Sequence, residues 1–298
     1  MSRDLPHAFQ SPPPELARAW DQFIANDDNH GHAQRGYVGG SLPQHLFAVW
    51  QNVTNSAQRV ASQTAPLQPQ VILDLGASAG GLSLALCRQF PAAAVYALEP
   101  EQEAYNLLCM MQSATHTAQL TPLHGVGEVL PLPDASVDLI VCHTVLEHVR
   151  DPEKVVSEMH RVLRPGGRVH LELPNYLWPI EPHLNTFFIP CAGKAAMKFL
   201  ARLQGLSAAQ AQFMDHLQLM TKPMLERIMR RQGFTFYNLV ADKIFADPTS
   251  QTHYVHSGWK RRFLGVLQNN PIGKFLLQTV LAVGLYPSLL YRLEKPKN

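Results

Sequence analysis

The chain has 298 residues, of which 46% are hydrophobic and 16% charged, with a formal net charge of +2. This length and apolar content are enough for one large core, or for one domain with sizeable insertions. The near balance of charge argues against nucleic acid as the main partner.

The cysteines and the N-terminal residues indicate the cellular compartment of the protein. The four cysteines form no C-x-x-C pair, and we interpret them as reduced core thiols without a metal or disulfide role. They are Cys87, Cys109, Cys142 and Cys191. Residues 1–15 contain four prolines and no apolar core, so they do not resemble a signal peptide. We therefore expect a cytosolic protein.

Residues 1–65 are expected to form an N-terminal region separate from the main domain, which would span 66–298. Residues 1–14 resemble a loose tail. Helical spacing of apolar residues follows over 15–25 and again over 42–61. The polar, glycine-rich stretch between these two segments predicts a loop.

From residue 71 onward, strand and helix patterns alternate. We place strands over 71–75, 94–98, 119–124, 137–142 and 168–173. The helices between them are expected over 80–89, 101–115 and 152–163. Pro165, Gly166 and Gly167 predict a turn before the fifth strand. Such alternation is typical of an α/β fold with a doubly wound, mostly parallel sheet covered by helices on both faces.

After residue 174 two insertions interrupt this rhythm, at about 175–215 and 241–286. A helix over 222–231 and a strand over 234–240 lie between them, and the seventh strand is expected over 288–294.

Residues 275–291 carry no charge, but the run is too short and too broken to span a bilayer. We interpret it as a buried packing helix that ends near Gly284. The alternatives are a helix on a membrane surface, beside the basic residues 260–262, and the wall of an apolar acceptor pocket.

The stretch 71–81, VILDLGASAGG, reads as a strand, a turn of small residues and the start of a helix. Gly76 and Gly80 can take backbone angles that other residues avoid, and they let a ligand approach the main chain. The helix start directs free N–H groups at that ligand. Alone, this pattern also fits an ordinary tight turn.

Other candidate ligand contacts follow the next three strands. Glu99 ends the second strand, 25 positions after Asp74, where a carboxylate can accept both ribose hydroxyls. Residues 125–128 follow the third strand, and His143 with Thr144 follow the fourth. Each one alone also fits a turn residue or a solvated side chain. In this order, at the carboxyl ends of a parallel sheet, they favour an adenosine ligand.

With these residues the chain resembles the class I S-adenosylmethionine-dependent methyltransferases, in particular the type 11 group. The matching segments are 71–80 (VILDLGASAG), 98–100 (LEP), 127–142 (GEVLPLPDASVDLIVC), 145–152 (VLEHVRDP) and 163–167 (LRPGG). The resemblance covers 71–175 well and 222–234 and 288–296 more loosely. It implies a Rossmann-like fold, S-adenosylmethionine as cofactor and methyl transfer, and says nothing about the acceptor.

The resemblance also implies a role for each matching residue. Gly76, Ser78 and Gly80 would line the methionine part of the cofactor, with Asp74 beneath their loop, and Glu99 would hold the ribose. The remaining three cofactor contacts would be Val126 and Gly127 beside the adenine, and His143 against the cofactor near the fourth strand.

Two departures from the family pattern are expected to weaken cofactor binding without removing the ribose contact. Ser78 stands where a second glycine is usual, and Val126 where an acid commonly contacts the adenine. Each departure is expected to weaken binding by about 1 kcal/mol, the net contribution of one hydrogen bond. The alternative cofactor, a dinucleotide, requires glycine at position 78 and is disfavoured by Ser78.

The enzyme needs a general base only if the group that receives the methyl must lose a proton, as a hydroxyl does. Our candidates for catalytic residues are Glu147, His148, Tyr176 and His183, with Glu181 close by. The alternative for His148 is a structural histidine at a helix start, and for His183 a solvated loop histidine. Relatives that methylate catechol-like quinone precursors carry Glu-x-x-Glu-His here for a metal. This chain has Thr144 at the first of those acids, so no metal is expected.

We expect methyl transfer to a small-molecule or lipid- or sugar-linked acceptor, most simply at oxygen. Similar insertions occur in type 11 relatives linked to cell-surface polysaccharide, lipid and secondary metabolism, and this resemblance implies an amphipathic acceptor. The late apolar segment adds peripheral contact with a membrane as a further expectation. The insertions and the N-terminal helices would form a lid, with Arg35 or Tyr37 reaching the cofactor carboxylate. The alternative is a non-catalytic cofactor-binding protein of the same fold that uses its lid to bind a partner.

Overall fold

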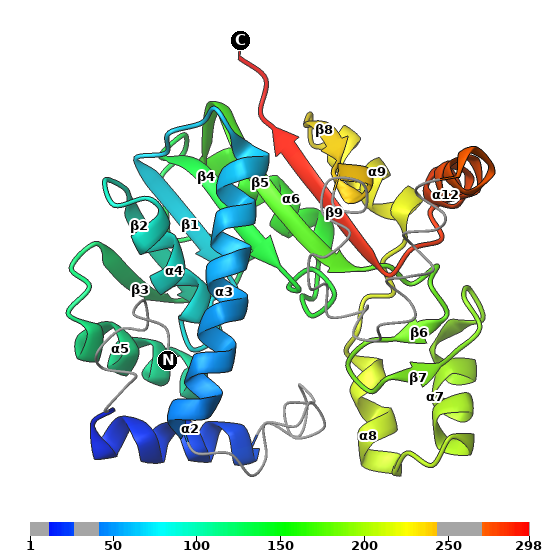
Figure 1. Ribbon diagram of the computed structural model, residues 1–298, viewed down its shortest axis with the longest axis horizontal. Helices are drawn as coiled ribbons and strands as arrows, with labels where there is room; N and C mark the ends of the chain where they lie inside the picture. Colours follow the sequence, from blue (N-terminus) through cyan, green and yellow to red (C-terminus); the bar gives the residue numbers. More distant parts are fainter. Residues whose placement is uncertain (1–11, 27–41, 243–269, 298) are drawn as a thin grey trace.

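The computed structural model describes residues 12–26, 42–242 and 270–297. Its central element is a seven-stranded sheet with the order β3-β2-β1-β4-β5-β9-β8. Figure 1 shows this sheet running through the molecule, with the insertion after β5 lying beyond the end of that strand, at the lower right. The expected doubly wound, seven-stranded α/β fold is confirmed.

The first five strands are parallel to one another, and the strand direction reverses between β5 and β9. They are β1 (Val71–Leu75), β2 (Ala94–Glu99), β3 (Leu120–His124), β4 (Val137–His143) and β5 (Leu163–Pro174). β9 (Ser288–Glu294) pairs antiparallel with β5 on one side and with β8 (Thr235–Asn238) on the other. The strand order reverses between β1 and β4, which places the topological switch point next to the turn that follows β1.

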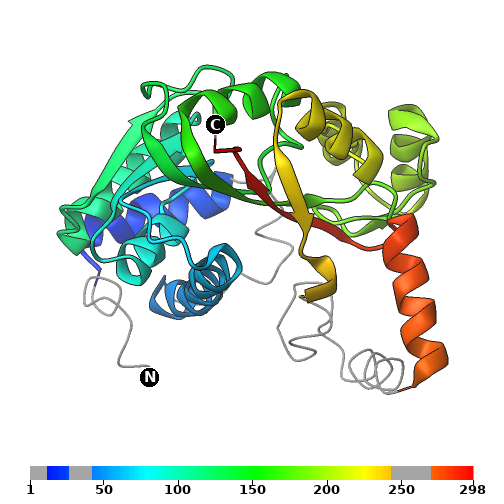
Figure 2. The ribbon, with the colours of Figure 1, turned by 90° about the horizontal axis from the view of Figure 1, so that it is seen from above.

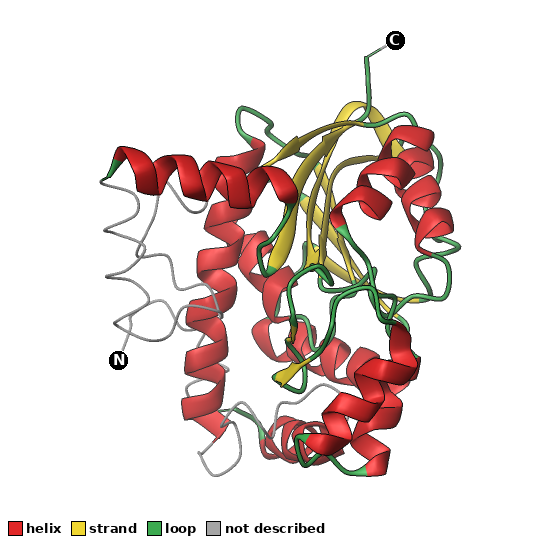
Figure 3. Ribbon diagram, turned by 90° about the vertical axis from the view of Figure 1, so that its right-hand side faces the viewer, coloured by secondary structure: helices red, strands yellow, loops and turns green. Residues whose placement is uncertain are grey.

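Helices cover both faces of the sheet, as Figure 2 shows from above and Figure 3 from the side. One face packs against α2 (Pro14–Asn26), α3 (Leu42–Thr64), α4 (Gly81–Gln89) and α5 (Gln102–Thr115). The other packs against α6 (Pro152–Val162) and α9 (Lys222–Arg231). Along β1 and β4 the side chains alternate between these two cores, so that Ile72 joins the first and Leu73 the second.

The N-terminal helices contribute to the first of these cores. Leu16 and Trp20 of α2 and Trp50, Ala57 and Val60 of α3 are all buried in it. Residues 27–41, which include Arg35 and Tyr37, lie outside the described residues. That the N-terminal helices also act as a lid stays a prediction.

The insertion after β5 has a hydrophobic core of its own. It contains the short hairpin β6 (Ile180–Glu181) and β7 (Thr186–Phe187), the helices α7 (Gly193–Leu203) and α8 (Ala208–Gln212), and the 3-10 turn η2 (Phe213–Asp215). Its core residues are Tyr176, Leu184, Phe188, Met197, Ala201, Phe213, Met214 and Leu217. The insertion is therefore a packed subdomain, and it begins where β5 ends.

β5 is longer than predicted. It begins at Leu163, because Leu163 pairs with Val137 and the register then shifts to Leu139 opposite Arg168. The predicted turn is thus absorbed into the strand as an irregularity, with Gly166 at φ +80°. This angle suits the third position of the predicted Pro-Gly turn.

The late apolar helix, α12 (Pro271–Val283), ends before Gly284 as expected, but our interpretation of it as a buried packing helix is wrong. Ile272 is 71% exposed, Phe275 68% and Val283 56%. Among the described residues no helix is both long and apolar enough to cross a bilayer. The basic residues 260–262 lie outside the described residues.

The four cysteines form no disulfide, as expected. Cys87 and Cys142 are buried, whereas Cys191 is exposed in the insertion, so the expected core position is wrong for Cys191.

Candidate functional site

The turn between β1 and α4 requires small residues for steric reasons. Gly76 has φ +78°, and a Cβ there would lie 2.3 Å from Cγ2 of Val145. Gly80 has φ +83°, and a Cβ there would lie 2.3 Å from Cδ1 of Leu108. Ser78 takes a left-handed φ of +48° without being glycine. Serine is thus accommodated by local backbone strain, which costs about 1–3 kcal/mol at such positions.

Glu99, at the end of β2, lies directly against this turn. Its Oε2 accepts a hydrogen bond of 2.7 Å from the Ser78 backbone N–H, and its Oε1 accepts one of 3.0 Å from the Glu101 backbone N–H. The side chain is 7% exposed. A carboxylate oxygen can accept more than one hydrogen bond, so these two bonds are compatible with contacts to the hydroxyls of a sugar. The structure therefore brings Glu99 to the turn, as the ribose prediction requires.

Asp74 lies beneath the turn and links β1 to α4. Its Oδ2 accepts a hydrogen bond of 2.6 Å from the Ser83 hydroxyl. Burial raises the pKa of Asp74 to about 7, against the smaller lowering effect of the Ser83 bond, and the nearby Glu99 raises it further. Asp74 thus supports the turn from inside and offers no exposed surface to a ligand.

The segment after β3 borders the same edge of the sheet. The Gly125 backbone N–H donates to the Glu99 carbonyl oxygen at 3.2 Å. A Cβ at Gly127 would lie 3.2 Å from Cγ1 of Val155, so a side chain fits there only if its neighbours move. Val126 is 47% exposed. This position beside Glu99 is compatible with the predicted contact to an adenine, which stays a prediction.

His143 ends β4 and begins a chain of polar side chains that leads to α3. Its Nε2 lies 2.7 Å from Nδ1 of the buried His170, and His170 Nε2 lies 2.7 Å from Oε1 of Gln63. Arg59, one turn earlier in α3, forms an ion pair of 2.7 Å with Glu172. Sequence reasoning did not anticipate Arg59 and Gln63. No signal in the sequence singles them out, because the helix carries many polar residues, as solvated helix faces commonly do.

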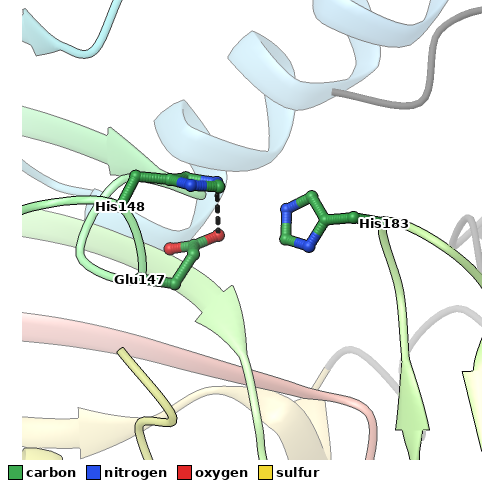
Figure 4. A group of neighbouring side chains, drawn as sticks. All are labelled: Glu147, His148 and His183. Carbon is green, nitrogen blue, oxygen red and sulfur yellow. Dashed lines mark ion pairs between the residues drawn. The ribbon is translucent and has the colours of Figure 1, made fainter. Parts of the chain in front are cut away.

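The loop after β4 and the insertion after β5 bring together three of the four predicted catalytic residues. Glu147, His148 and His183 each offer a ligand atom, and these atoms all lie within 4.8 Å of one another. Figure 4 shows the His183 ring, which comes from the insertion, facing the Glu147–His148 pair. We call these three residues the Glu-His-His cluster. The Val145 side chain lies against Gly76 and Val145 precedes Glu147 by two residues, so the loop that carries Glu147 and His148 begins at the small-residue turn.

Glu147 is fully buried, and neither of its carboxyl oxygens has a hydrogen-bond partner in the described part of the chain. Its Oε1 lies 3.9 Å from Nε2 of His148, which is too long for a hydrogen bond. Burial raises the pKa of Glu147 to about 8. The His148 side chain beside it is 27% exposed.

Glu181 holds the His183 ring through a contact to its Nδ1 atom. Its Oε1 lies 2.6 Å from His183 Nδ1, and its Oε2 accepts a hydrogen bond of 2.6 Å from the Leu184 backbone N–H. This leaves Nε2 as the ring nitrogen of His183 that faces Glu147 and His148 (Figure 4). Tyr176 is buried in the insertion core, with its hydroxyl 3.4 Å from Glu181 Oε1. Tyr176 therefore lies behind the cluster and is not part of it.

Comparison with known proteins finds a family match to the part of the chain that forms the five parallel strands. Residues 73–171 match the model of a methyltransferase-domain family. The malonyl-(acyl-carrier protein) O-methyltransferase of Methylococcus capsulatus is 37% identical over 173 residues, which cover 58% of this chain and 54% of that protein. The chain spans between about a fifth and three fifths of the length of the first four curated relatives that it matches.

Solved structures share the fold at low sequence identity. Phosphoethanolamine N-methyltransferase 2 of Haemonchus contortus, solved with S-adenosyl-L-methionine, has a TM-score of 0.50 and 15% identity over 85% of this chain and 57% of that one. The (4+2)-cyclase SpnF has a TM-score of 0.51 and 14% identity, covering 82% of this chain and 81% of that one. At such identities the likeness shows the fold alone.

Proposed function

Residues 73–171 are a methyltransferase domain of the class I, S-adenosylmethionine-dependent type 11 group, and from this premise we propose that the whole chain is an O-methyltransferase. Its acceptor would be a small molecule or a lipid- or sugar-linked compound. The relative from Methylococcus capsulatus, which is named for methylation at an oxygen, supports this choice of atom.

The observation that carries the proposal is the position of Glu99. Its carboxylate is anchored by two backbone N–H groups at the carboxyl edge of the sheet, between the small-residue turn and the start of α5. A preoriented carboxylate at the topological switch point suits the two ribose hydroxyls of an adenosyl group. We call Asp74, the turn 76–80 and Glu99 the cofactor end of the site.

When bound, S-adenosylmethionine supplies an electrophilic methyl group on a sulfonium. The chain's part is to align the acceptor with that methyl group and to exclude water. An acceptor hydroxyl must also lose its proton as its oxygen bonds to the methyl carbon, while the sulfur keeps the electron pair of the broken bond. The Glu-His-His cluster next to the turn is suited to such an acceptor, and we call it the acceptor end.

The exposed apolar side chains of α12 support an amphipathic acceptor. Ile272, Phe275 and Leu276 are each more than half exposed, and they lie on a helix that leads into β9. An exposed apolar surface of this kind is typical of a contact with a lipid chain or with a membrane surface. Peripheral membrane contact is part of the proposal for this reason.

Calorimetric titration with S-adenosylmethionine tests the cofactor end. Glu99→Ala is expected to weaken binding at least tenfold, because the ribose hydroxyls lose their acceptor. Glu101→Ala is the matched control, since Glu101 is an exposed acid two residues away that contributes its backbone N–H and keeps it after substitution. Unchanged affinity in a folded Glu99→Ala protein would remove the ribose assignment.

The second candidate function is a non-catalytic cofactor-binding protein of the same fold. The two departures at Ser78 and Val126 favour it, and SpnF illustrates that the fold is not limited to proteins named as methyltransferases. Tight S-adenosylmethionine binding without methylation of any acceptor in a broad extract would support this candidate. Methyl transfer to any compound in that extract would exclude it.

A further inference from the structure

We propose that Glu147, His148 and His183 bind one divalent transition-metal cation, for which Zn²⁺ is the appropriate probe. Sequence reasoning gave no metal, because Thr144 lacks the acid that a related motif places there. The structure supplies a different third side chain, His183, which comes from the insertion after β5.

The three side chains form a known type of ligand set. Two imidazoles and one carboxylate are sufficient to hold Zn²⁺ or Fe²⁺ and leave further coordination positions open. Around a tetrahedral zinc ion the bonds are about 2.0–2.2 Å, so ligand atoms lie about 3.4 Å apart. The three atoms here lie within 4.8 Å of one another, and His148 Nε2 and Glu147 Oε1 are 3.9 Å apart. Inward side-chain movements of about 1 Å would close the site, which is within the reach of rotamer adjustment.

The second, independent observation is the state of the Glu147 carboxyl group. The other buried carboxyl groups of the described residues each accept at least one hydrogen bond: Asp74 from Ser83, Glu99 from Ser78, Glu158 from Leu130 and Glu181 from Leu184. Glu147, with 0% exposure, accepts none. A buried carboxyl group without a partner is destabilising, in either protonation state. A cation bound between Glu147 and the two imidazoles would supply the missing partner.

The surroundings of His183 are those of a metal-binding histidine. Metal-bound histidines usually donate their second ring N–H to a carboxylate or carbonyl, which fixes the ring and its tautomer. Glu181, itself held by the Leu184 N–H, provides this contact to His183 Nδ1 at 2.6 Å. The arrangement therefore presents Nε2 to the cluster with the lone pair that a cation requires.

The position of the ion relative to the cofactor end gives the ion a role in the proposed reaction. This role rests on the proposed function. The cluster is joined to the small-residue turn through Val145. An acceptor hydroxyl in the open coordination position would have its pKa lowered by the ion. Its proton would pass to solvent before the oxygen takes the methyl group. Thr144, in a left-handed conformation of φ +54°, redirects the chain from β4 into this loop.

Metal binding is tested on the full chain without S-adenosylmethionine, after treatment with a chelator and its removal. Calorimetry with Zn²⁺ and metal analysis after equilibrium dialysis are expected to give one ion per chain. Glu147→Gln and His183→Gln should each weaken Zn²⁺ binding at least tenfold. Glu181→Gln, a change at a positioning residue, should weaken it about 10- to 100-fold. His216→Gln, a change at an exposed histidine of the same insertion, is the control and should leave affinity unchanged.

Substitution with Co²⁺ gives a readout that needs no variant. The wild-type protein should show the visible absorption of a Co²⁺ ion with nitrogen and oxygen ligands and low coordination number, and Zn²⁺ should displace it. Absence of a stoichiometric site in the folded wild-type protein would overturn the proposal. So would affinities in Glu147→Gln and His183→Gln equal to that of the control. Because no cofactor is present, these outcomes are separate from the test of Glu99.

Discussion

At the cofactor end of the site, the Glu99 carboxylate accepts hydrogen bonds from two backbone N–H groups, whereas at the acceptor end neither oxygen of Glu147 accepts one within the described residues. The cofactor end is built mainly from main chain, inside one α/β unit. The acceptor end is built from side chains of two segments, the loop after β4 and the insertion. The first is complete before any ligand binds, and the second gains its missing contacts from a ligand.

The largest difference between the two regions is expected from glycine substitutions. Gly76→Ala should lower the free energy of unfolding by about 2–5 kcal/mol, because φ is +78° and the new Cβ would collide with Val145. Gly193→Ala in the insertion has a similar φ of +82° with no atom within 4 Å, so backbone strain alone should cost about 1 kcal/mol. Urea denaturation measures both. Equal losses would show that the turn is not sterically limited.

Asp74 is an exception within the cofactor end, because burial outweighs its one side-chain hydrogen bond. Its pKa is raised from 3.8 to about 7, so the native state binds a proton more tightly than the unfolded state. The stability of the protein should therefore fall as the pH rises from about 4 to about 7, and the Asp74 contribution should be constant above that. Three pKa units correspond to an upper limit of about 4 kcal/mol.

Asp74→Asn removes this contribution and keeps an acceptor for the Ser83 hydroxyl. The variant should gain about 2–4 kcal/mol relative to wild type between pH 4 and pH 8, in denaturation curves recorded at each pH. Asp21→Asn, at an exposed carboxyl group on α2, is the control and should follow the wild-type curve. If the stability difference between Asp74→Asn and wild type does not change with pH, Asp74 is not the group that titrates.

Replacing glutamate by glutamine at the cofactor end and at the acceptor end compares the two through smaller changes in stability. Glu99→Gln should cost about 1–2 kcal/mol of stability, because an amide cannot replace both charge-assisted bonds to backbone N–H groups. Glu147→Gln, measured at pH 4 in the presence of a chelator, should change stability by less than about 0.5 kcal/mol, since no hydrogen bond is lost. At higher pH the variant should gain stability relative to wild type, because burial raises the pKa of Glu147 to about 8. A large loss at Glu147 in metal-free protein would mean that its carboxyl group has a partner after all.

The sequence was sufficient to predict elements that are bounded by clear local signals. β1 and β9 have the predicted bounds, because each is an apolar run that ends at a break in the pattern. β5 was predicted too short, because the pairing of Leu163 with Val137 depends on a neighbouring strand. The exposure of α12 could not be predicted either, since an apolar helix has the same sequence pattern whether or not another element covers it.

Prediction of the site from the sequence has the same limit. Glu99 and the small-residue turn were recognisable because both follow strands of one parallel sheet, whose carboxyl ends must meet. Glu147, His148 and His183 were each candidates, but their convergence depends on how the insertion folds back over the loop after β4. One signal was available: Glu147 follows Val145 and Leu146 in a buried segment, and a buried acid requires a partner.

The position of β9 has a consequence for how the chain is made. β9 lies between β5 and β8 in the sheet, yet it is formed by residues 288–294, long after β5 has been synthesised. A nascent chain on the ribosome must therefore keep one edge of β5 unpaired until residue 288 has emerged. Open strand edges readily pair with other chains, so the nascent protein is exposed to aggregation during this interval, in which a chaperone could protect it.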